Sequence, residues 1–373
     1  MEVLISNFTN ITWGSVIMWL IGGILIYLAI VKEMEPTLLL PMGFGAILVN
    51  LPIAIPGTGV QHVLDTLFSI GIDGAELFPL MLFIGIGAMI DFTPLLTNPK
   101  LMIFGAAAQF GIFFTLALAS LFGYDIRDAA SIAIIGAADG PTSIFVATEL
   151  GSKYLGAIMV AAYSYMALVP LVQPPIIKLC TTKAERKIKM KYTGKPVSKL
   201  TKILFPIVVT VIVGIVAPDA VALIGFLMFG NLIRECGALN SLSETAQNAL
   251  ANLITIFLGI TIASQMKAAD FLQLDTLIII GLGLVAFIFD TFGGIMIAKL
   301  MNLFMKEKIN PMIGAAGISA FPMSARVVHK MGLEEDNQNF LLMHSIGVNV
   351  SGQIASVIAG GLILALVKAM IGG

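Results

Sequence analysis

The sequence is poor in charge, histidine and cysteine. Of its 373 residues, 12% are charged, three are histidine and two are cysteine, Cys180 and Cys236. Two cysteines this far apart provide no disulfide framework, and the histidines lack the spacing of metal ligands. A net charge of −1 offers no basic surface for nucleic acid. The sequence has no Walker loop or dinucleotide fingerprint, so we expect neither ATP nor a redox cofactor held by this chain to be the energy source.

Apolar residues, in contrast, are abundant. They make up 58% of the chain, and the mean hydropathy of +0.98 predicts an all-α polytopic membrane protein. We expect Trp13 to Val31 to be a retained first helix, because Glu2 is acidic and no basic start or cleavage site is visible. Ten segments are predicted to cross about 30 Å of hydrocarbon: 13–31, 38–55, 78–96, 101–122, 154–178, 203–217, 219–233, 248–265, 276–303 and 341–370.

Two further apolar stretches, 128–149 and 310–328, are interrupted by Gly, Pro and polar residues. Such interruptions are typical of broken or re-entrant membrane segments, in which freed backbone groups line a binding site. Between the halves of the chain, eight Lys and Arg residues accompany a single acid, Glu185, and the positive-inside rule places this stretch in the cytoplasm. We therefore divide the chain into a first membrane repeat, a basic cytoplasmic linker and a second membrane repeat: 1–180, 181–202 and 203–373.

The two halves echo each other in sequence. The run Ile135-Gly-Ala-Ala138 recurs as Ile313-Gly-Ala-Ala316, so the interrupted segments occupy the same place in each half, and Gly43 to Asn50 resembles Gly225 to Asn231. If the interrupted segments are re-entrant, each half makes five crossings, and this odd number inverts the second half relative to the first. The chain then has about ten crossings, both ends outside, and two tips that meet near the membrane midplane. If the interrupted segments cross fully, the count is twelve and the ends lie inside.

Asp139 is the strongest candidate for chemistry. It lies beside Gly140 and Pro141 in the first interrupted segment, and an ionisable residue inside apolar sequence is a functional-site hypothesis by default. One interpretation is a cap on the second half of a broken helix. The other is a cation or proton site, in which the carboxylate, the Thr142 hydroxyl and freed carbonyls supply the oxygen ligands that Na⁺ requires. The two interpretations are compatible.

The last long helix carries a polar stripe. Asn349, Gly352 and Ser356 are spaced i, i+3 and i+7 and share one helical face. An alternative is a seam of interhelical hydrogen bonds in which Gly and Ser allow close packing. The density of amide and hydroxyl groups argues against a packing seam alone. The other polar residues of the stripe are His344, Ser351 and Gln353.

Aligning the halves places Tyr163 to Tyr165 opposite Asn349 to Ser351. A membrane tyrosine is most often an interfacial anchor. These tyrosines lie in the middle of their segment, which favours hydrogen bonding or a proton relay, and Tyr165 is the candidate for that role.

A second buried carboxylate is expected at Asp290. Its repeat partner is the apolar Phe114, so this acid belongs to one half only. We expect a second cation site, a proton acceptor, or an ion-pair partner for Arg326. In the second interrupted segment, Ser319, Ser324 and Arg326 are expected to receive an anionic group, and a plain cytoplasmic anchor is the alternative role for Arg326.

These motifs carry a resemblance to a known family. Gly136-Ala-Ala-Asp-Gly-Pro-Thr142, Tyr163-Ser-Tyr165 and the run from Asn349 to Ser356 resemble the β subunit of the Na⁺-translocating biotin-dependent decarboxylases, and the likeness covers essentially the whole chain. It implies a membrane pump in which carboxybiotin is decarboxylated while Na⁺ moves outward and a proton is consumed. The chain also resembles the shorter members, which act with acyl-CoA substrates that a soluble carboxyltransferase subunit selects.

The resemblance implies roles for individual residues. Asp139 and Thr142 would bind Na⁺ together with residues of the last helix, and Tyr165 would assist proton transfer. The anionic group that Ser319 and Arg326 are expected to receive would then be carboxybiotin. The Na⁺ ligands expected from the last helix are Asn349, Ser351, Gly352 and Ser356, of which Ser356 also joins Asp139 and Tyr165 in the catalytic set, and Asp290 is the candidate second Na⁺ site.

Biotin is expected on another chain, because Lys189-Met190-Lys191 reverses the Met-Lys-Met pattern of biotin attachment. The implied partners are a biotin carrier subunit, the carboxyltransferase α subunit and a small membrane γ subunit, with several copies of this chain in a complex of the bacterial cytoplasmic membrane. The competing class is a secondary transporter, such as a Na⁺/H⁺ antiporter or a Na⁺-coupled organic-anion carrier, which fold physics alone does not separate from a pump. A membrane scaffold is the third alternative.

Overall fold

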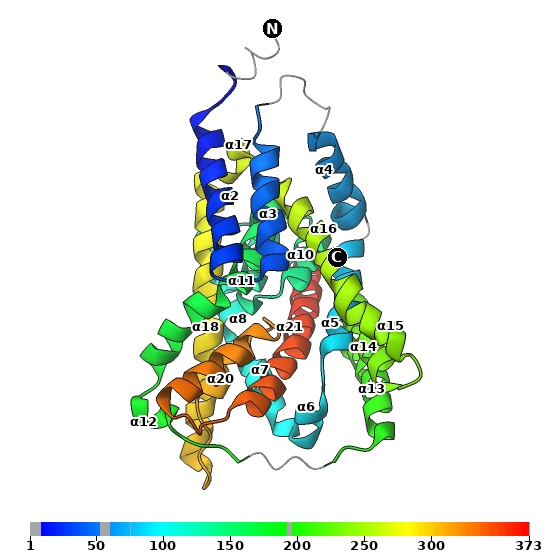
Figure 1. Ribbon diagram of the computed structural model, residues 1–373, viewed down its shortest axis with the longest axis vertical. Helices are drawn as coiled ribbons and strands as arrows, with labels where there is room; N and C mark the ends of the chain where they lie inside the picture. The colour runs from blue at the N-terminus through cyan, green and yellow to red at the C-terminus, as the bar shows by residue number, and fades with distance from the viewer. Residues whose placement is uncertain (1–8, 53–59, 75, 192–195, 373) are drawn as a thin grey trace.

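The computed structural model describes residues 9–52, 60–74, 76–191 and 196–372, and these residues form helices and no β-strand. The helices build an elongated bundle, with α2, α3 and α4 in one half of its length and α6, α12 and α20 in the other (Figure 1). In the first half of the chain the helices are α2 (Trp13–Val31), α3 (Pro36–Val49), α4 (Val60–Phe68), α5 (Leu77–Met89), α6 (Thr93–Thr97), α7 (Met102–Ala108), α8 (Phe110–Leu121), α9 (Ile126–Ala133), α10 (Gly140–Glu149) and α11 (Leu155–Cys180).

The second half of the chain contains a similar set. Its helices are α12 (Lys183–Arg186), α13 (Lys199–Val216), α14 (Val221–Glu235), α15 (Asn240–Glu244), α16 (Ala251–Ala263), α17 (Ala268–Phe271), α18 (Leu274–Phe304), α19 (Met312–Ala315), α20 (Met323–Glu335) and α21 (Leu342–Met370). Short 3-10 or π-helical turns join several of them: η1 (Ser69–Asp73), η2 (Pro99–Leu101), η3 (Ile134–Ala137), η4 (Pro218–Ala220) and η5 (Thr245–Leu250).

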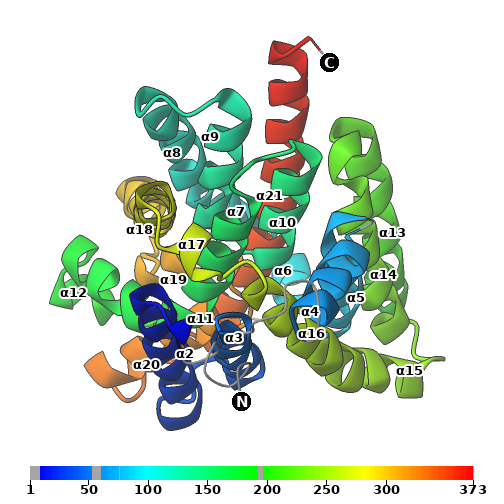
Figure 2. The same ribbon diagram turned by 90° about the horizontal axis from the view of Figure 1, so that it is seen from above.

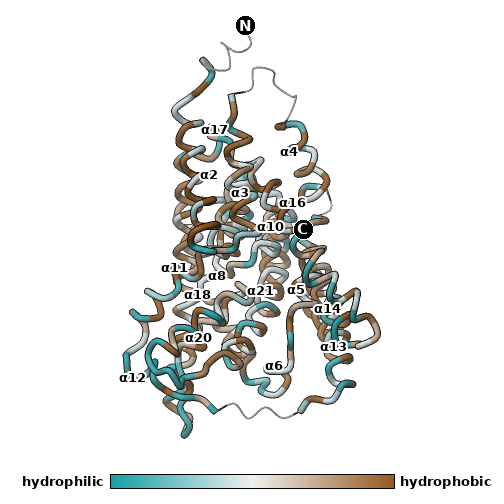
Figure 3. Tube along the Cα trace, in the orientation of Figure 1, coloured by the Kyte–Doolittle hydropathy of each residue, from teal (hydrophilic) through white to brown (hydrophobic). Residues whose placement is uncertain are grey.

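The bundle has the length and surface of a multi-pass membrane protein. In the described residues, seven helical segments are long and apolar enough to cross a membrane, or eight if α4 with η1 and α5, which are bent by 63°, form one span. Large apolar side chains lie on the outside, and Leu121 and Leu179 are 84% and 88% exposed. Hydrophilic residues concentrate at one end, around α12 and α20 (Figure 3). The predicted all-α membrane class is confirmed.

Both predicted interruptions are present. The first segment consists of α9, η3 and α10, and the second consists of α19 and α20 joined by an irregular turn. Helix α20 runs to Glu335, past the predicted limit at 328, because its second half is too polar to be visible in an apolar pattern. Segment 101–122, predicted as continuous, is divided at Gln109 into α7 and α8. In the described part of segment 38–55 the helix is α3, with 14 residues, and positions 53–55 lie outside the described residues.

Helices of the two halves pack in matching pairs. Helix α3 packs on α16, and its counterpart α14 packs on α5. Asn50, at the end of α3, donates to the Met266 carbonyl (2.7 Å) beyond the end of α16. Asn231 of α14 donates to the Ile90 carbonyl (2.9 Å) at the end of α5. The two asparagines, which the sequence echo paired, therefore perform the same capping task on opposite helices.

The centre of the bundle is formed by α10, α11 and α21. Viewed along the bundle, they lie between α8 and α18 on one side and α5, α13 and α14 on the other (Figure 2). The most apolar window of α21 is 72% buried, whereas that of α13 is 11% buried. A polar side chain on α21 is therefore enclosed by protein, and one on the outer face of α13 would meet lipid.

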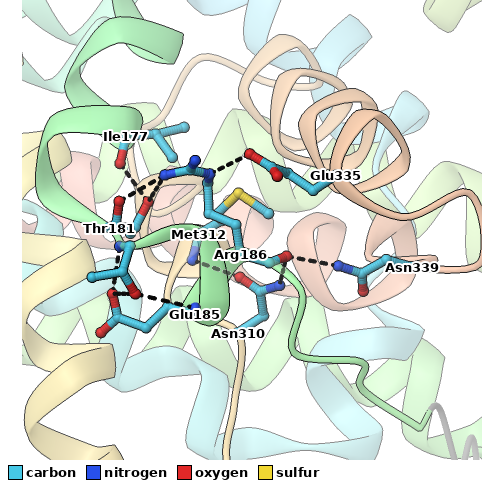
Figure 4. A network of polar contacts seen from close by, with 9 residues as sticks. Ile177, Thr181, Glu185, Arg186, Asn310, Met312, Glu335 and Asn339 are labelled. Atoms are coloured by element: carbon cyan, nitrogen blue, oxygen red, sulfur yellow. Dashed lines mark hydrogen bonds and ion pairs between the residues drawn. The ribbon is translucent and has the colours of Figure 1, made fainter.

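The linker is fastened to the second interrupted segment. The Arg186 side chain pairs with Glu335 (2.6 Å) and donates to the Thr181 carbonyl (2.7 Å), as Figure 4 shows. The Arg186 carbonyl accepts from the side-chain amides of Asn310 and Asn339, each at 2.8 Å. The linker thus ties the end of α11 to both ends of the segment that contains α19 and α20.

Candidate functional site

The first interrupted segment turns sharply just before Asp139. Ala138 has a left-handed backbone (φ 51°), which is uncommon for a residue with a side chain and recurs at functional sites. Asp139 is then the N-cap of α10, and Pro141 lies in the first turn, where its missing N–H costs nothing. The Asp-Gly-Pro-Thr sequence therefore ends one helix, starts the next and places a carboxylate at the break. The expected cap is present.

The Asp139 carboxylate is the centre of a network from three segments. Its Oδ2 accepts hydrogen bonds from the Thr142 hydroxyl (2.7 Å), the Ser356 hydroxyl (2.9 Å), the Ser319 hydroxyl (3.1 Å) and the Gln353 amide (3.1 Å). The hydroxyls of Ser319 and Ser356 are 3.0 Å apart. The first interrupted segment, the second interrupted segment and α21 thus converge on one oxygen atom.

The tips of the two interrupted segments touch at this point. The backbone N–H of Ser319 donates to the Ala137 carbonyl (2.9 Å). From α21, the Asn349 amide donates to the Ile318 carbonyl (2.7 Å). Gly352 lets α21 approach, since a Cβ there would lie 2.1 Å from the Gly317 carbonyl oxygen. The predicted meeting of the tips is confirmed as a direct contact.

The electrostatics of the network call for a cation or a proton. Asp139 is 3% exposed, and no Lys, Arg or His side chain of the described residues pairs with it. A buried carboxylate without a positive partner costs several kcal/mol. Hydroxyl oxygens can donate to the carboxylate when no ion is bound and can turn their lone pairs toward a hard cation when one is. The residues able to hold Na⁺ together are Asp139, Thr142, Ser319 and Ser356.

A cavity of about 200 Å³ leads from the surface to this network. Its inner end is formed by Asp139, Ser319 and Gln353. The fully buried Tyr163 of α11 lines it too, and its ring lies against Gly140, where a Cβ would come within 2.3 Å. The Tyr163 hydroxyl has no hydrogen-bond partner in the described part of the chain.

Comparison with known proteins identifies the family. The family model described as the Na⁺-transporting oxaloacetate decarboxylase beta subunit matches residues 14–367. The chain belongs to this family. It is therefore a membrane subunit of the Na⁺-transporting decarboxylase class, and the lone secondary transporter is the less supported alternative.

Curated relatives extend over nearly the whole chain. The glutaconyl-CoA decarboxylase subunit beta of Acidaminococcus fermentans is 50% identical over 97% of this chain and 96% of its own length. The methylmalonyl-CoA decarboxylase subunit beta of Propionigenium modestum is 48% identical over 97% of both chains. The oxaloacetate decarboxylase beta chain of Haemophilus ducreyi is 45% identical over 100% of both. Relatives with three different substrate names are thus similar to this chain to nearly the same degree.

Two residues expected among the decarboxylase site residues lie apart from the Asp139 network. The Tyr165 hydroxyl donates to the Ile280 carbonyl on α18. The Ser351 hydroxyl donates to the carbonyls of Leu101 (3.0 Å) and Val348 (2.6 Å). In the described structure neither hydroxyl bonds Asp139. Tyr163, two positions before Tyr165, is the tyrosine that lines the cavity.

The structure separates the three residues that were predicted to receive an anionic group. Ser319 is in the Asp139 network, but Arg326 is exposed on α20. Burial raises the pKa of Glu35, which lies at the mouth of the cavity, and the positive charge of Arg326 opposes that rise. Ser324 faces elsewhere and bonds Gln173 of α11 (2.8 Å).

Asp290 occupies a separate place on α18. Its Oδ1 accepts from the backbone N–H of Ile112 (3.1 Å) at the start of α8. Its Oδ2 has no hydrogen-bond partner among the described residues and lies against Gly136, where a Cβ would be 2.7 Å away. Asp290 therefore caps α8 from another helix and makes no ion pair with Arg326 in the described structure.

Gln353 is the network member that our site prediction omitted. It belongs to the polar stripe of α21 and lies four residues after Asn349, so helical spacing already placed it on the face of Asn349 and Ser356. An amide also serves as a hydrogen-bond donor to a carboxylate, which is its role here. Its position on this helical face was the sequence signal that could have identified Gln353 as a site residue.

Proposed function

We propose that this chain couples the decarboxylation of carboxybiotin, carried on a partner subunit, to outward transport of Na⁺ with consumption of a proton. The observation that carries the proposal is the environment of the Asp139 carboxylate. It accepts hydrogen bonds from three hydroxyl groups and one amide, and it has no positively charged partner among the described residues. The charge of such a carboxylate is neutralised when a proton or Na⁺ is bound, and burying the carboxylate with neither bound costs free energy. Competition between these two occupants would link ion movement to proton uptake.

In this scheme the residues divide by position. Asp139, Thr142, Ser319 and Ser356 hold Na⁺, and the Asn349 side-chain oxygen, buried and without a partner in the described chain, is a further ligand within the same tip region. Tyr163 is the proton-transfer candidate that the cavity supports, because it lines the cavity together with Asp139 and its hydroxyl has no partner among the described residues. Tyr165 acts by holding α11 against α18.

Biotin would come from a partner. Lys189, in the reversed attachment pattern, pairs with Asp336 (3.0 Å) and bonds Gln338. We assign the partners as a biotin carrier subunit, a carboxyltransferase α subunit and a small membrane γ subunit, in a complex with several copies of this chain. We place the complex in the bacterial cytoplasmic membrane, with the linker 181–202 on the cytoplasmic side.

We further propose that 1–180 and 203–373 are inverted repeats. The exchange of packing partners between the halves supports this. Helix α3 of the first half packs on α16 of the second, and its counterpart α14 of the second half packs on α5 of the first. Both repeats also contain a π-helical turn before the equivalent helix, η1 before α5 and η5 before α16. An inverted pair places one interrupted segment on each side of the site, as alternating access requires.

The test is Asp139→Asn in the assembled complex. Na⁺-dependent decarboxylation of free biotin carboxylate and ²²Na⁺ uptake into proteoliposomes are expected to be lost, and normal coupled turnover would contradict the proposal. Na⁺ should also protect the wild-type chain against thermal unfolding, by about 2.7 kcal/mol at one hundred times its dissociation constant. That protection should vanish in Asp139→Asn and persist in Ser120→Ala, whose hydroxyl is on the exposed side of α8.

A further inference from the structure

The cavity has a polar wall outside the Asp139 network. Gln247, Asn252 and Thr255, from η5 and α16, line it together with the inner residues Asp139 and Gln353. Gln247 and Asn252 are five residues apart, which in an α-helix separates side chains by about 140° around the axis. The wider π-helical turn at Thr245–Leu250 reduces this angle and brings both amides to one wall.

These two amides have no hydrogen-bond partner within the described chain. Their neighbours differ, since the Asn248 amide donates to the Glu244 carbonyl (2.9 Å) and the Thr255 hydroxyl to the Ala251 carbonyl (2.7 Å). All of them lie in the candidate membrane span Asn240–Ala263. Asn252 is exposed and Gln247 is half-buried, so both unpaired amides are accessible to a ligand that enters the cavity.

Packing does not explain an amide at this place. Phe83-Ile-Gly-Ile86 in the first half aligns with Phe257-Leu-Gly-Ile260 in the second, and this alignment pairs Phe78 with Asn252. Phe78 is buried and stacks on Phe257 at 5.8 Å. The first repeat therefore fills the position with an aromatic ring. The second repeat has an amide there and turns it to the cavity.

We propose that Gln247 and Asn252 bind the ureido edge of carboxybiotin, and this rests on the proposed function. After carboxylation of one ring nitrogen, the other N–H and the ring carbonyl remain on one edge. A primary amide is complementary to that edge, because its NH₂ donates to the carbonyl and its oxygen accepts from the N–H. Two such amides hold the ring while its carboxylate is directed toward Asp139.

The size and charge of the cavity agree with this ligand. A volume of about 200 Å³ is below the roughly 300–1,000 Å³ of pockets for drug-sized molecules, so it accepts one small bicyclic head and excludes an acyl-CoA. The carboxylate of the ligand and that of Asp139 repel each other. Binding at the amide wall therefore becomes favourable when Na⁺ or a proton has neutralised Asp139, and the wall itself needs no charge.

The decisive measurement compares Asn252→Leu and Gln247→Leu with the wild-type complex. The KM for free biotin carboxylate should rise about tenfold for each variant, the loss expected for one hydrogen-bonded group, while kcat and the Na⁺ concentration for half-maximal rate stay within twofold. Asn248→Ala, which removes an amide that bonds its own helix, is the matched control and should leave KM unchanged. An unchanged KM in both leucine variants would overturn the proposal.

Direct binding gives a readout independent of turnover. Free biotin should raise the apparent Tm of the purified complex, and 2-iminobiotin, which lacks the ring carbonyl oxygen, should raise it less. Asn252→Leu should lose the biotin shift and Asn252→Gln should recover part of it, and an equal shift in wild type and Asn252→Leu would contradict the subsite.

The same measurement separates the two proposals. A biotin shift that persists in Asp139→Asn, while the Na⁺ shift is lost, supports both assignments. If Na⁺ has no effect on the wild type but biotin protects it through Asn252, the cation site fails and the amide subsite stands. If Asn252→Leu changes the Na⁺ dependence as much as the KM, the amide acts on the ion pathway and the subsite is wrong.

Discussion

The two interrupted segments share a backbone plan and differ in chemistry. Both contain an Ile-Gly-Ala-Ala run that is followed by a break and a helix, and their tips touch through the Ser319 N–H and the Ala137 carbonyl. The first presents a carboxylate at Asp139. At the equivalent place the second has Gly317, whose carbonyl is in contact with α21 at Gly352.

This difference separates ion chemistry from close packing. A carboxylate is useful where hydroxyl groups surround it, and the first segment obtains one of those groups, Ser319, from the second. A glycine is useful where backbones must approach, and the second segment offers that contact to α21. One segment supplies charge and the other supplies the surface that confines it, so a symmetric fold holds an asymmetric site.

Adding a side chain to the second tip is expected to give the largest effect. In Gly317→Ala the new Cβ would lie 2.6 Å from the Phe104 carbonyl oxygen and 2.8 Å from the Ala108 Cβ, both on rigid backbone. We expect a loss of about 1–3 kcal/mol in stability and loss of Na⁺-dependent decarboxylation. Thermal unfolding and ²²Na⁺ uptake measure the two. Gly281→Ala, where a Cβ would meet nothing within 4 Å, is the control, and equal behaviour of the two variants would refute the packing role.

Asp290 tests whether the second repeat has ion chemistry of its own. Asp290→Ala removes the acceptor for the Ile112 N–H, and an unsatisfied buried donor costs about 1–3 kcal/mol. Asp290→Asn keeps an acceptor oxygen, so its apparent Tm should stay near wild type with Na⁺ dependence unchanged. If the asparagine variant folds normally but loses Na⁺ coupling, Asp290 is a second ion site, which is one of the roles that the sequence left open.

The centre of the site was predictable because its signals are local. Asp139 interrupts an apolar run beside Gly140 and Pro141, and Ser356 lies on the polar face of the last helix. Which of Tyr163 and Tyr165 lines the cavity was not predictable. Residues two apart point to opposite sides of a helix, and both sides of α11 are lined by apolar sequence, so the sequence carries no mark of which side faces the cavity.

The fold was predictable where its signals lie within the segment concerned. Apolar length revealed most of the long helices, and repeat spacing revealed that the tips meet. The break between α7 and α8 has a distant cause, since Gln109 is neither Gly nor Pro and the nearby Ile112 N–H bonds Asp290, 178 residues further along the chain. A single sequence contains no local trace of a cap supplied by another helix.

Two serines on α21 were both predicted to bind Na⁺, but only Ser356 lies in the Asp139 network, and the two can be compared by mutation. Ser356→Ala removes a hydroxyl from Asp139 and should raise the Na⁺ concentration for half-maximal rate about tenfold, the effect of one hydrogen-bonded group. Ser351→Ala removes a hydroxyl that bonds Leu101 and Val348 and should shift it less than twofold. The steady-state rate as a function of Na⁺ measures both, and the opposite ranking would restore Ser351 as a ligand.

The smallest effect on stability is expected where Arg186 of the linker pairs with Glu335 of the second interrupted segment, a pair that we call the clamp. The hydrogen bond from Arg186 holds the pKa of Glu335 below its ordinary value of 4.5, and both side chains are partly exposed, at 12% and 15%. An acid whose pKa is lowered by folding contributes stability above the unfolded-state pKa, and the contribution is lost as the pH falls through the folded-state pKa. Glu335→Gln should therefore lower stability by up to about 1 kcal/mol at pH 7. The difference in apparent Tm between wild type and variant should shrink as the pH falls below 4.5, whereas a difference independent of pH would show that the pair does not hold the clamp.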